Sequence, residues 1–134
     1  MDEVYCTNDF IKEFDNLKTK KKCKDLENLV LDYFLNNSFD IVAAGSRLFG
    51  PDHLPYLKKR IPDAGGYRLY FLADINTKKI YINFVHTKTP PLGYANIGLI
   101  KKKSLHDSVL VSKNSNTGLF KLSRCPINNT AIFI

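Results

Sequence analysis

The chain has 134 residues, of which 44% are hydrophobic and 25% are charged, so it has the size and composition of one folded domain and not of a disordered chain. Twenty basic residues against thirteen acidic ones give a net charge of +7, which favours a polyanionic partner: nucleic acid, an anionic membrane or an acidic protein. No apolar run reaches the roughly eighteen residues of a membrane span, and the acidic start lacks a signal core, so we expect a cytoplasmic protein with no membrane partner.

Two helices are predicted in the N-terminal half, after a short strand at 4–6. Thr7 or Asn8 is the predicted N-cap of the first helix. Apolar side chains recur at helical spacing: Phe10, Phe14 and Leu17 in the first helix, and Leu26, Leu29, Val30, Tyr33 and Phe34 in the second. Residues 38–53, with two glycines and a proline, are predicted to connect these helices to a sheet.

An antiparallel meander is predicted over residues 54–88, because aromatic and apolar residues alternate there with polar ones. Its strands are expected at 56–61, 67–72 and 79–86, with Gly65-Gly66 as the tight turn before the second. Beyond it we predict a short helix at 94–103 and two strands, at 108–113 and 118–123, followed by a final apolar run at 130–134. The element order predicts an α+β fold in a single domain, residues 1–134, with 104–134 as a C-terminal β extension.

Most cofactor-binding motifs are missing from the sequence. It contains no P-loop, GxGxxG, HExxH or GxSxG pattern. Cys6, Cys23 and Cys125 are widely scattered and make no zinc-like pattern with the histidines, so free thiols are expected. We therefore expect neither a cofactor nor a bound metal.

Basic and aromatic side chains gather instead on the predicted meander. Neighbouring strands lie about 4.8 Å apart and alternate residues share a face, so Lys59, Arg68 and either His86 or Lys88 are predicted to converge, with Tyr94 close by. Such a cluster would hold a phosphate between cations, with a histidine or tyrosine available for proton transfer. The alternatives are structural: Arg68 paired with Asp63 or Asp74, solvated lysines on an edge strand, and packed His86 and Tyr94.

RNA cleavage needs little more than this arrangement. The 2′-OH of the RNA is the nucleophile, a base removes its proton, cations stabilise the pentacoordinate phosphate, and an acid protonates the departing 5′-oxygen. No metal is required, and DNA, which lacks the 2′-OH, would not be cleaved.

The central segment also resembles a known family. Leu57-Lys58-Lys59-Arg60, then Gly65-Gly66-Tyr67-Arg68-Leu69-Tyr70-Phe71, then Val85-His86-Thr87-Lys88, is similar to the RelE/HigB-like toxins of bacterial toxin–antitoxin systems. The resemblance implies two N-terminal helices packed on a small antiparallel sheet. It also implies metal-independent cleavage of ribosome-bound mRNA, with mRNA, the ribosome and a cognate antitoxin protein as partners.

Residue roles follow from the same resemblance. Arg68 matches the arginine that contacts the scissile phosphate, and Lys59 falls in the basic strand, with Lys58 or Arg60 as the alternatives. Lys88 stands where many members have an arginine, and Tyr94 where some have a base-stacking tyrosine. The predicted catalytic set is Lys59, Arg68, His86, Lys88 and Tyr94, and the predicted RNA-binding set is Lys58, Arg60, Lys101 and Lys102.

Two other functions stay open. ParE-type relatives share the RelE fold and act on gyrase without nuclease activity, so a non-enzymatic toxin is one alternative. A basic RNA-binding module without cleavage is the other, since the charge and the aromatic residues suit both.

Overall fold

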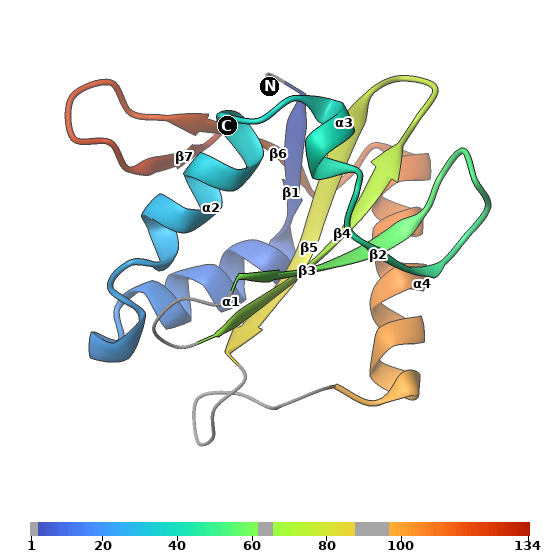
Figure 1. Cartoon of the computed structure of the whole chain (residues 1–134), viewed down its shortest axis with the longest axis horizontal. Coiled ribbons are helices and arrows are strands. Elements are labelled where there is room, and N and C mark those ends of the chain that lie inside the picture. The colour runs from blue at the N-terminus through green and yellow to red at the C-terminus, as the bar shows by residue number, and fades with distance from the viewer. Residues whose placement is uncertain (1–2, 62–65, 88–96) are drawn as a thin grey trace.

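A mixed sheet of seven strands runs through the molecule, with α1 and α2 against one face and α4 against the other (Figure 1). The structure is a computed structural model and describes residues 3–61, 66–87 and 97–134. In chain order the elements are β1 (Val4–Thr7), α1 (Asn8–Lys18), a 3₁₀ helix η1 (Lys21–Cys23), α2 (Leu26–Leu35), α3 (Phe39–Val42), β2 (Ser46–Phe49), β3 (Tyr56–Ile61), β4 (Tyr67–Asp74), β5 (Lys79–Thr87), α4 (Leu99–Ser115), β6 (Leu119–Arg124) and β7 (Ala131–Phe133).

The sheet is larger than expected and is not purely antiparallel. Its strand order is β2-β3-β4-β5-β1-β6-β7, and β1 runs parallel to β5, whereas its other pairings are antiparallel. The prediction of two N-terminal helices on a small antiparallel RelE-like sheet is therefore wrong. The apolar pattern located most strands, but it contains no information on which strand edges pair.

The C-terminal region differs most from the prediction. A single helix, α4, covers the segment in which a strand at 108–113 was expected. Leu105 and Val109 lie four residues apart and are both buried against the sheet, so tertiary packing overrides the strand preference of the Val109-Leu110-Val111 run. Asn116, with φ of 53°, ends the helix in the left-handed region. The segment 104–134 thus contains most of α4 as well as β6 and β7.

The N-terminal predictions fare better. Thr7 is confirmed as the N-cap of α1, since its hydroxyl accepts a hydrogen bond of 3.3 Å from the Phe10 N–H. The stretch 38–53 is more than a connector, because it contains α3 and β2, and β2 pairs with β3. Among the described residues, none of the helices is both long and apolar enough to cross a membrane.

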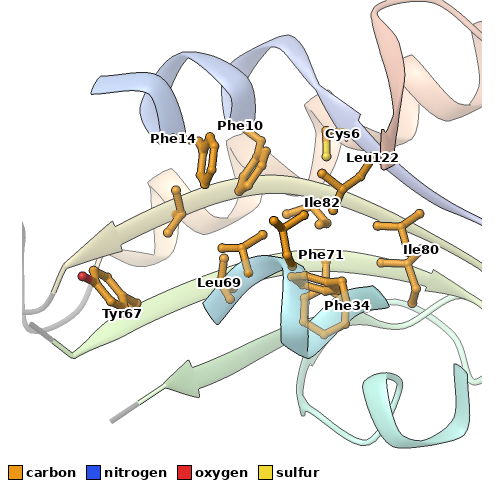
Figure 2. Packing of buried hydrophobic residues seen from close by; sticks show 14 of the residues in the cluster. Cys6, Phe10, Phe14, Phe34, Tyr67, Leu69, Phe71, Ile80, Ile82 and Leu122 are labelled. Atoms are coloured by element: carbon orange, nitrogen blue, oxygen red, sulfur yellow. The ribbon is translucent and has the colours of Figure 1, made fainter. Parts of the chain in front are cut away.

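Aromatic side chains dominate the core between the sheet and the first two helices. Figure 2 shows Phe10 and Phe14 of α1 reaching towards the sheet, and their rings stack at 5.5 Å. Phe34 of α2 meets Phe71 of β4 edge to face, at 5.3 Å between ring centroids. All four side chains are fully buried, so this face of β4 and β5 is closed to solvent and the functional surface lies elsewhere.

The opposite face of the sheet is covered by α4 along part of its length. Tyr56, Tyr70 and Phe84 form an aromatic layer there, on which Leu105 and Val109 of α4 rest. The pairing of β4 with β5 shifts register at Tyr70, which leaves one extra residue, Asn83, in β5. Asn83 accepts a hydrogen bond of 2.7 Å from the Tyr56 hydroxyl and donates one of 2.8 Å to the Leu105 carbonyl, which holds α4 on the sheet.

Candidate anion-binding site

The strand register gathers four predicted site residues on the face that carries α4. Arg60, Arg68 and His86 are direct cross-strand neighbours on β3, β4 and β5. In the next row of the same face, Lys58 stands opposite Tyr70. Alternation along a strand therefore brings Arg68 together with Lys58, Arg60 and His86.

Lys59 lies on the other side of the sheet. It pairs with Leu69, whose side chain is in the core beneath α1 and α2, and its ammonium stands 5.4 Å from the centre of the Tyr33 ring. The expected convergence of Lys59 with Arg68 is not found, because residues of opposite parity in paired strands face opposite sides. Lys88 and Tyr94 lie outside the described residues.

The first turn of α4 brings further cations to the face of Arg68. Lys102 is near enough to Lys58 to perturb its ionisation, and the ammonium of Lys101 stands 5.1 Å from the centre of the Phe84 ring. We call Lys58, Arg60, Arg68 and Lys102 the basic cluster. It joins β3, β4 and α4, which come from three separate parts of the chain.

The electrostatics of Lys58 show how close these charges are. Burial lowers its pKa below the ordinary lysine value, and the neighbouring charges of Lys102, Arg60 and Arg68 lower it further. All of the charges that act on Lys58 in this way are positive. A cluster of cations with this mutual repulsion is stabilised when an anion binds among them.

Removing one of these charges tests the arrangement. In a Lys102→Gln variant, the pKa of Lys58 is expected to rise towards its ordinary value but not to reach it, because burial is the larger cause. An NMR titration of the Lys58 side chain measures this. Lys101→Gln is the matched control, since Lys101 is not among the charges that lower this pKa. Equal pKa values in both variants would contradict the proximity of Lys102 to Lys58.

Arg68 is the least ordinary member of the cluster. Only 8% of it is exposed, and its Nε–H has no hydrogen-bond partner in the part of the chain that the structure describes. Within residues 3–61, 66–87 and 97–134, no carboxylate forms an ion pair with it. Of its two expected partners, Asp74 pairs with Lys113 at 3.5 Å, and Asp63 lies outside the described residues. A buried cationic donor without an acceptor costs free energy, and an anion that accepts its hydrogen bond would recover that cost.

A hydrogen-bonded pair lies beside Arg68. The Tyr70 hydroxyl is 3.1 Å from Nε2 of His86, and Nδ1 of His86 is 2.8 Å from the Thr87 carbonyl oxygen. A carbonyl only accepts, so Nδ1 carries a hydrogen, and when the ring is neutral Nε2 accepts from Tyr70. Burial raises the pKa of Tyr70 to about 12, although Arg68 and Arg60 act in the opposite direction. Tyr70 is therefore a hydrogen donor at neutral pH.

Sequence reasoning missed two features of this site. Tyr70 was not singled out, although it stands two residues after Arg68 and therefore shares its face. Lys102 was assigned to RNA binding, but its place beside Lys58 depends on how α4 docks, which the sequence does not reveal.

Neither a possible metal site nor a similar known protein helps to assign the function of this site. The described histidines, cysteines, aspartates and glutamates include no group of three placed to hold a metal ion. The sequence matches none of the protein-family models and none of the curated proteins with which it was compared.

Proposed function

We propose that the protein binds RNA through the basic cluster and cleaves it without a metal, by attack of the RNA's own 2′-OH. The observation that carries this proposal is the buried Arg68, which has no acidic partner and no acceptor for its Nε–H among the described residues and is set among Lys58, Arg60 and Lys102. Planar guanidinium groups suit the oxygens of a phosphodiester, which accept two parallel hydrogen bonds.

Each member of the cluster has a role in this reaction. Arg68 and Arg60 hold the phosphate and stabilise the charge of the pentacoordinate state. Lys58, whose pKa is lowered, removes the 2′-OH proton in its uncharged form. Lys102 protonates the departing 5′-oxygen, and the 2′,3′-cyclic phosphate remains on the other product. The Tyr70–His86 pair fixes the side chains that border Arg68.

The dependence on the 2′-OH tests this proposal. Purified protein is expected to cut a single-stranded RNA in the presence of EDTA and to leave a 2′,3′-cyclic phosphate. A matched oligonucleotide with a single 2′-deoxy substitution at the cleaved position is expected to resist cleavage there while it binds with unchanged affinity. Cleavage of the deoxy-substituted oligonucleotide at the same position would rule out the proposed nucleophile.

The buried positions of Tyr70 and His86 favour a second candidate, an RNA-binding module without cleavage. Tyr70 is fully buried and His86 is 3% exposed, so neither of these two side chains is placed to add a further acid or base to Lys58 and Lys102. Such a module would bind RNA with an affinity that falls steeply with salt, and would leave the RNA intact. The same assay separates the two candidates, since only the nuclease yields cyclic phosphate.

For the biological role, we propose a toxin of a toxin–antitoxin system that cleaves ribosome-bound mRNA in the cytoplasm and so inhibits translation. Its support is the sequence similarity around Gly66–Phe71 and not the fold, which differs from the expected one. Induction of the chain is expected to stop growth and to create new mRNA ends on translating ribosomes. A neighbouring gene product should neutralise it. Growth arrest with intact mRNA would instead favour a target such as gyrase.

A further inference from the structure

The connection between α1 and α2 carries a second group of positive charges outside the basic cluster. We call it the lysine turn, and it consists of Lys20, Lys21, Lys22 and Lys24. All four side chains are exposed, and no ion pair forms with them in the part of the chain that the structure describes. The nearest acids in sequence are engaged elsewhere: Asp15 pairs with Lys18 at 3.2 Å, and Asp25 accepts a hydrogen bond of 2.6 Å from Tyr67.

The backbone of the lysine turn is held in place. Cys23 is 1% exposed and anchors η1 in the core. The N–H of Cys23 donates to the Lys20 carbonyl at 2.9 Å, and the N–H of Lys20 donates to the Leu17 carbonyl at 2.9 Å. The lysines therefore project from a fixed base, which reduces the ordering cost of binding a polyanion.

The lysine turn lies at the same end of the sheet as the basic cluster. The hydrogen bond from Tyr67 to Asp25 joins the first residue of β4 to the residue after the lysine turn. Arg68 is the next residue of β4 and faces the other side of the sheet. In Figure 1, the blue segment that joins α1 to α2 lies at the lower left, on the same side of the picture as the start of β4.

The edge of β3 connects the two groups of charges. In the described residues, β2 pairs with β3 only as far as Lys58, so the outer edge of β3 beyond it has no strand beside it. Lys59 and Arg60 occupy that edge and face opposite sides of the sheet. Arg60 belongs to the basic cluster, and Lys59 stands over Tyr33 of α2, the helix that follows the lysine turn.

We propose that an RNA strand held at the basic cluster passes over the free edge of β3, between Arg60 and Lys59, and binds the lysine turn with its continuing phosphates. This inference rests on the proposed RNA-binding function and extends it, because it assigns a longer binding site and a path across the protein surface to the bound strand. It also gives Lys59 a place in RNA binding on the opposite face from Arg68. Exposed lysines along a path recognise the backbone and not the base sequence.

The test compares two RNA lengths and two sets of three lysines. Single-stranded RNAs of about four and about sixteen nucleotides bracket a short and a long binding site. The variant Lys20→Gln, Lys21→Gln, Lys22→Gln removes three charges from the lysine turn. The control, Lys78→Gln, Lys79→Gln, Lys121→Gln, removes three charges away from it, and Lys78 and Lys79 lie at the opposite end of β4 and β5. Fluorescence anisotropy at several salt concentrations gives each affinity.

The expected result is specific to length and to position. The lysine-turn variant should lose about tenfold in affinity for the longer RNA and less than about twofold for the shorter one. The slope of log affinity against log salt for the longer RNA should shrink by about 2, since each lost contact with a single strand is worth roughly 0.7. The control should keep the wild-type slope. An equal loss in the control, or no loss in the lysine-turn variant, would overturn the inference.

Two further measurements separate this inference from the proposed function. If Arg68→Met abolishes binding of the short RNA while the lysine-turn variant leaves the long RNA unaffected, the inference fails and the function stands. If wild-type protein binds neither RNA, both the inference and the proposed function fail.

A competition experiment distinguishes RNA from an acidic protein as the partner of the lysine turn. Polyglutamate of matched charge is the competitor. Wild-type binding to it as tight as to RNA, lost in the lysine-turn variant, would assign the lysine turn to an acidic protein instead.

Discussion

An Arg68→Met variant is expected to be more stable than the wild-type protein and inactive on RNA. Arg68 is 8% exposed, and its Nε–H has no acceptor among the described residues, so the folded state bears the cost of a desolvated donor. Methionine fills a similar volume without a charge. The free energy of unfolding should rise by about 1–3 kcal/mol, the usual cost of an unsatisfied buried polar group.

The same substitution removes the donor that the proposed reaction needs most. Loss of one well-placed donor to a developing negative charge typically slows a reaction by about 10²–10³-fold, and cleavage should fall at least that far. Urea unfolding and RNA cleavage, measured on the same preparation, check both halves. Arg47→Met is the matched control, because Arg47 is an exposed arginine with its own partner, Asp52, at 2.5 Å. That control should be no more stable than wild type and fully active.

A loss of stability in Arg68→Met would show that Arg68 has a structural partner and that its Nε–H is not a free donor. Unchanged cleavage in that variant would remove Arg68 from the site. Opposite changes in stability and activity are typical of groups retained for function, since the cost they impose on the fold is compensated only when the ligand binds.

The sequence predicted the strands around Arg68 because their pattern is local. Residues 67–72 are an aromatic and apolar run, residues 79–86 alternate, and the structure has β4 and β5 there. The residues that lie next to Arg68 in space come from distant parts of the sequence. They depend on the register between strands. In the structure Arg60 stands opposite Arg68, and moving the pairing by one residue would place Lys59 there instead. The sequence shows which residues of one strand share a face, but it does not show which residues of two strands stand opposite each other.

The position of α4 could not be predicted from the sequence, for a different reason. Val109-Leu110-Val111 favours a strand on local preference, and Lys101-Lys102-Lys103 was taken as the end of a helix when it stands near the beginning of one. Only the contact of Leu105 and Val109 with the aromatic layer of the sheet decides in favour of the helix. The parallel pairing of β1 with β5 likewise depends on a long-range contact, made after α1 and α2 have crossed the sheet.

Replacing Asn83 with leucine is expected to cause the largest loss of stability among changes near the site. The Asn83 amide links a buried tyrosine of β3 to the middle of α4, through its bonds of 2.7 Å from Tyr56 and 2.8 Å to Leu105. Leucine leaves the Tyr56 hydroxyl without its acceptor in a fully buried position, at a cost of about 2–3 kcal/mol. Since α4 also carries Lys102, looser docking of the helix should weaken RNA binding.

A double-mutant cycle with Tyr56→Phe separates the hydrogen bond from general damage to the core. Phenylalanine alone leaves the Asn83 oxygen without its donor and is also destabilising, but Asn83→Leu with Tyr56→Phe removes both polar partners together. The double variant should therefore be more stable than the sum of the single losses implies, with a coupling of about 1–2 kcal/mol. Additive losses would mean that the bond between Asn83 and Tyr56 does not contribute. In that case the contribution of Asn83 to the docking of α4 comes from its hydrogen bond to the Leu105 carbonyl, beside the packing of Leu105 and Val109 on the sheet.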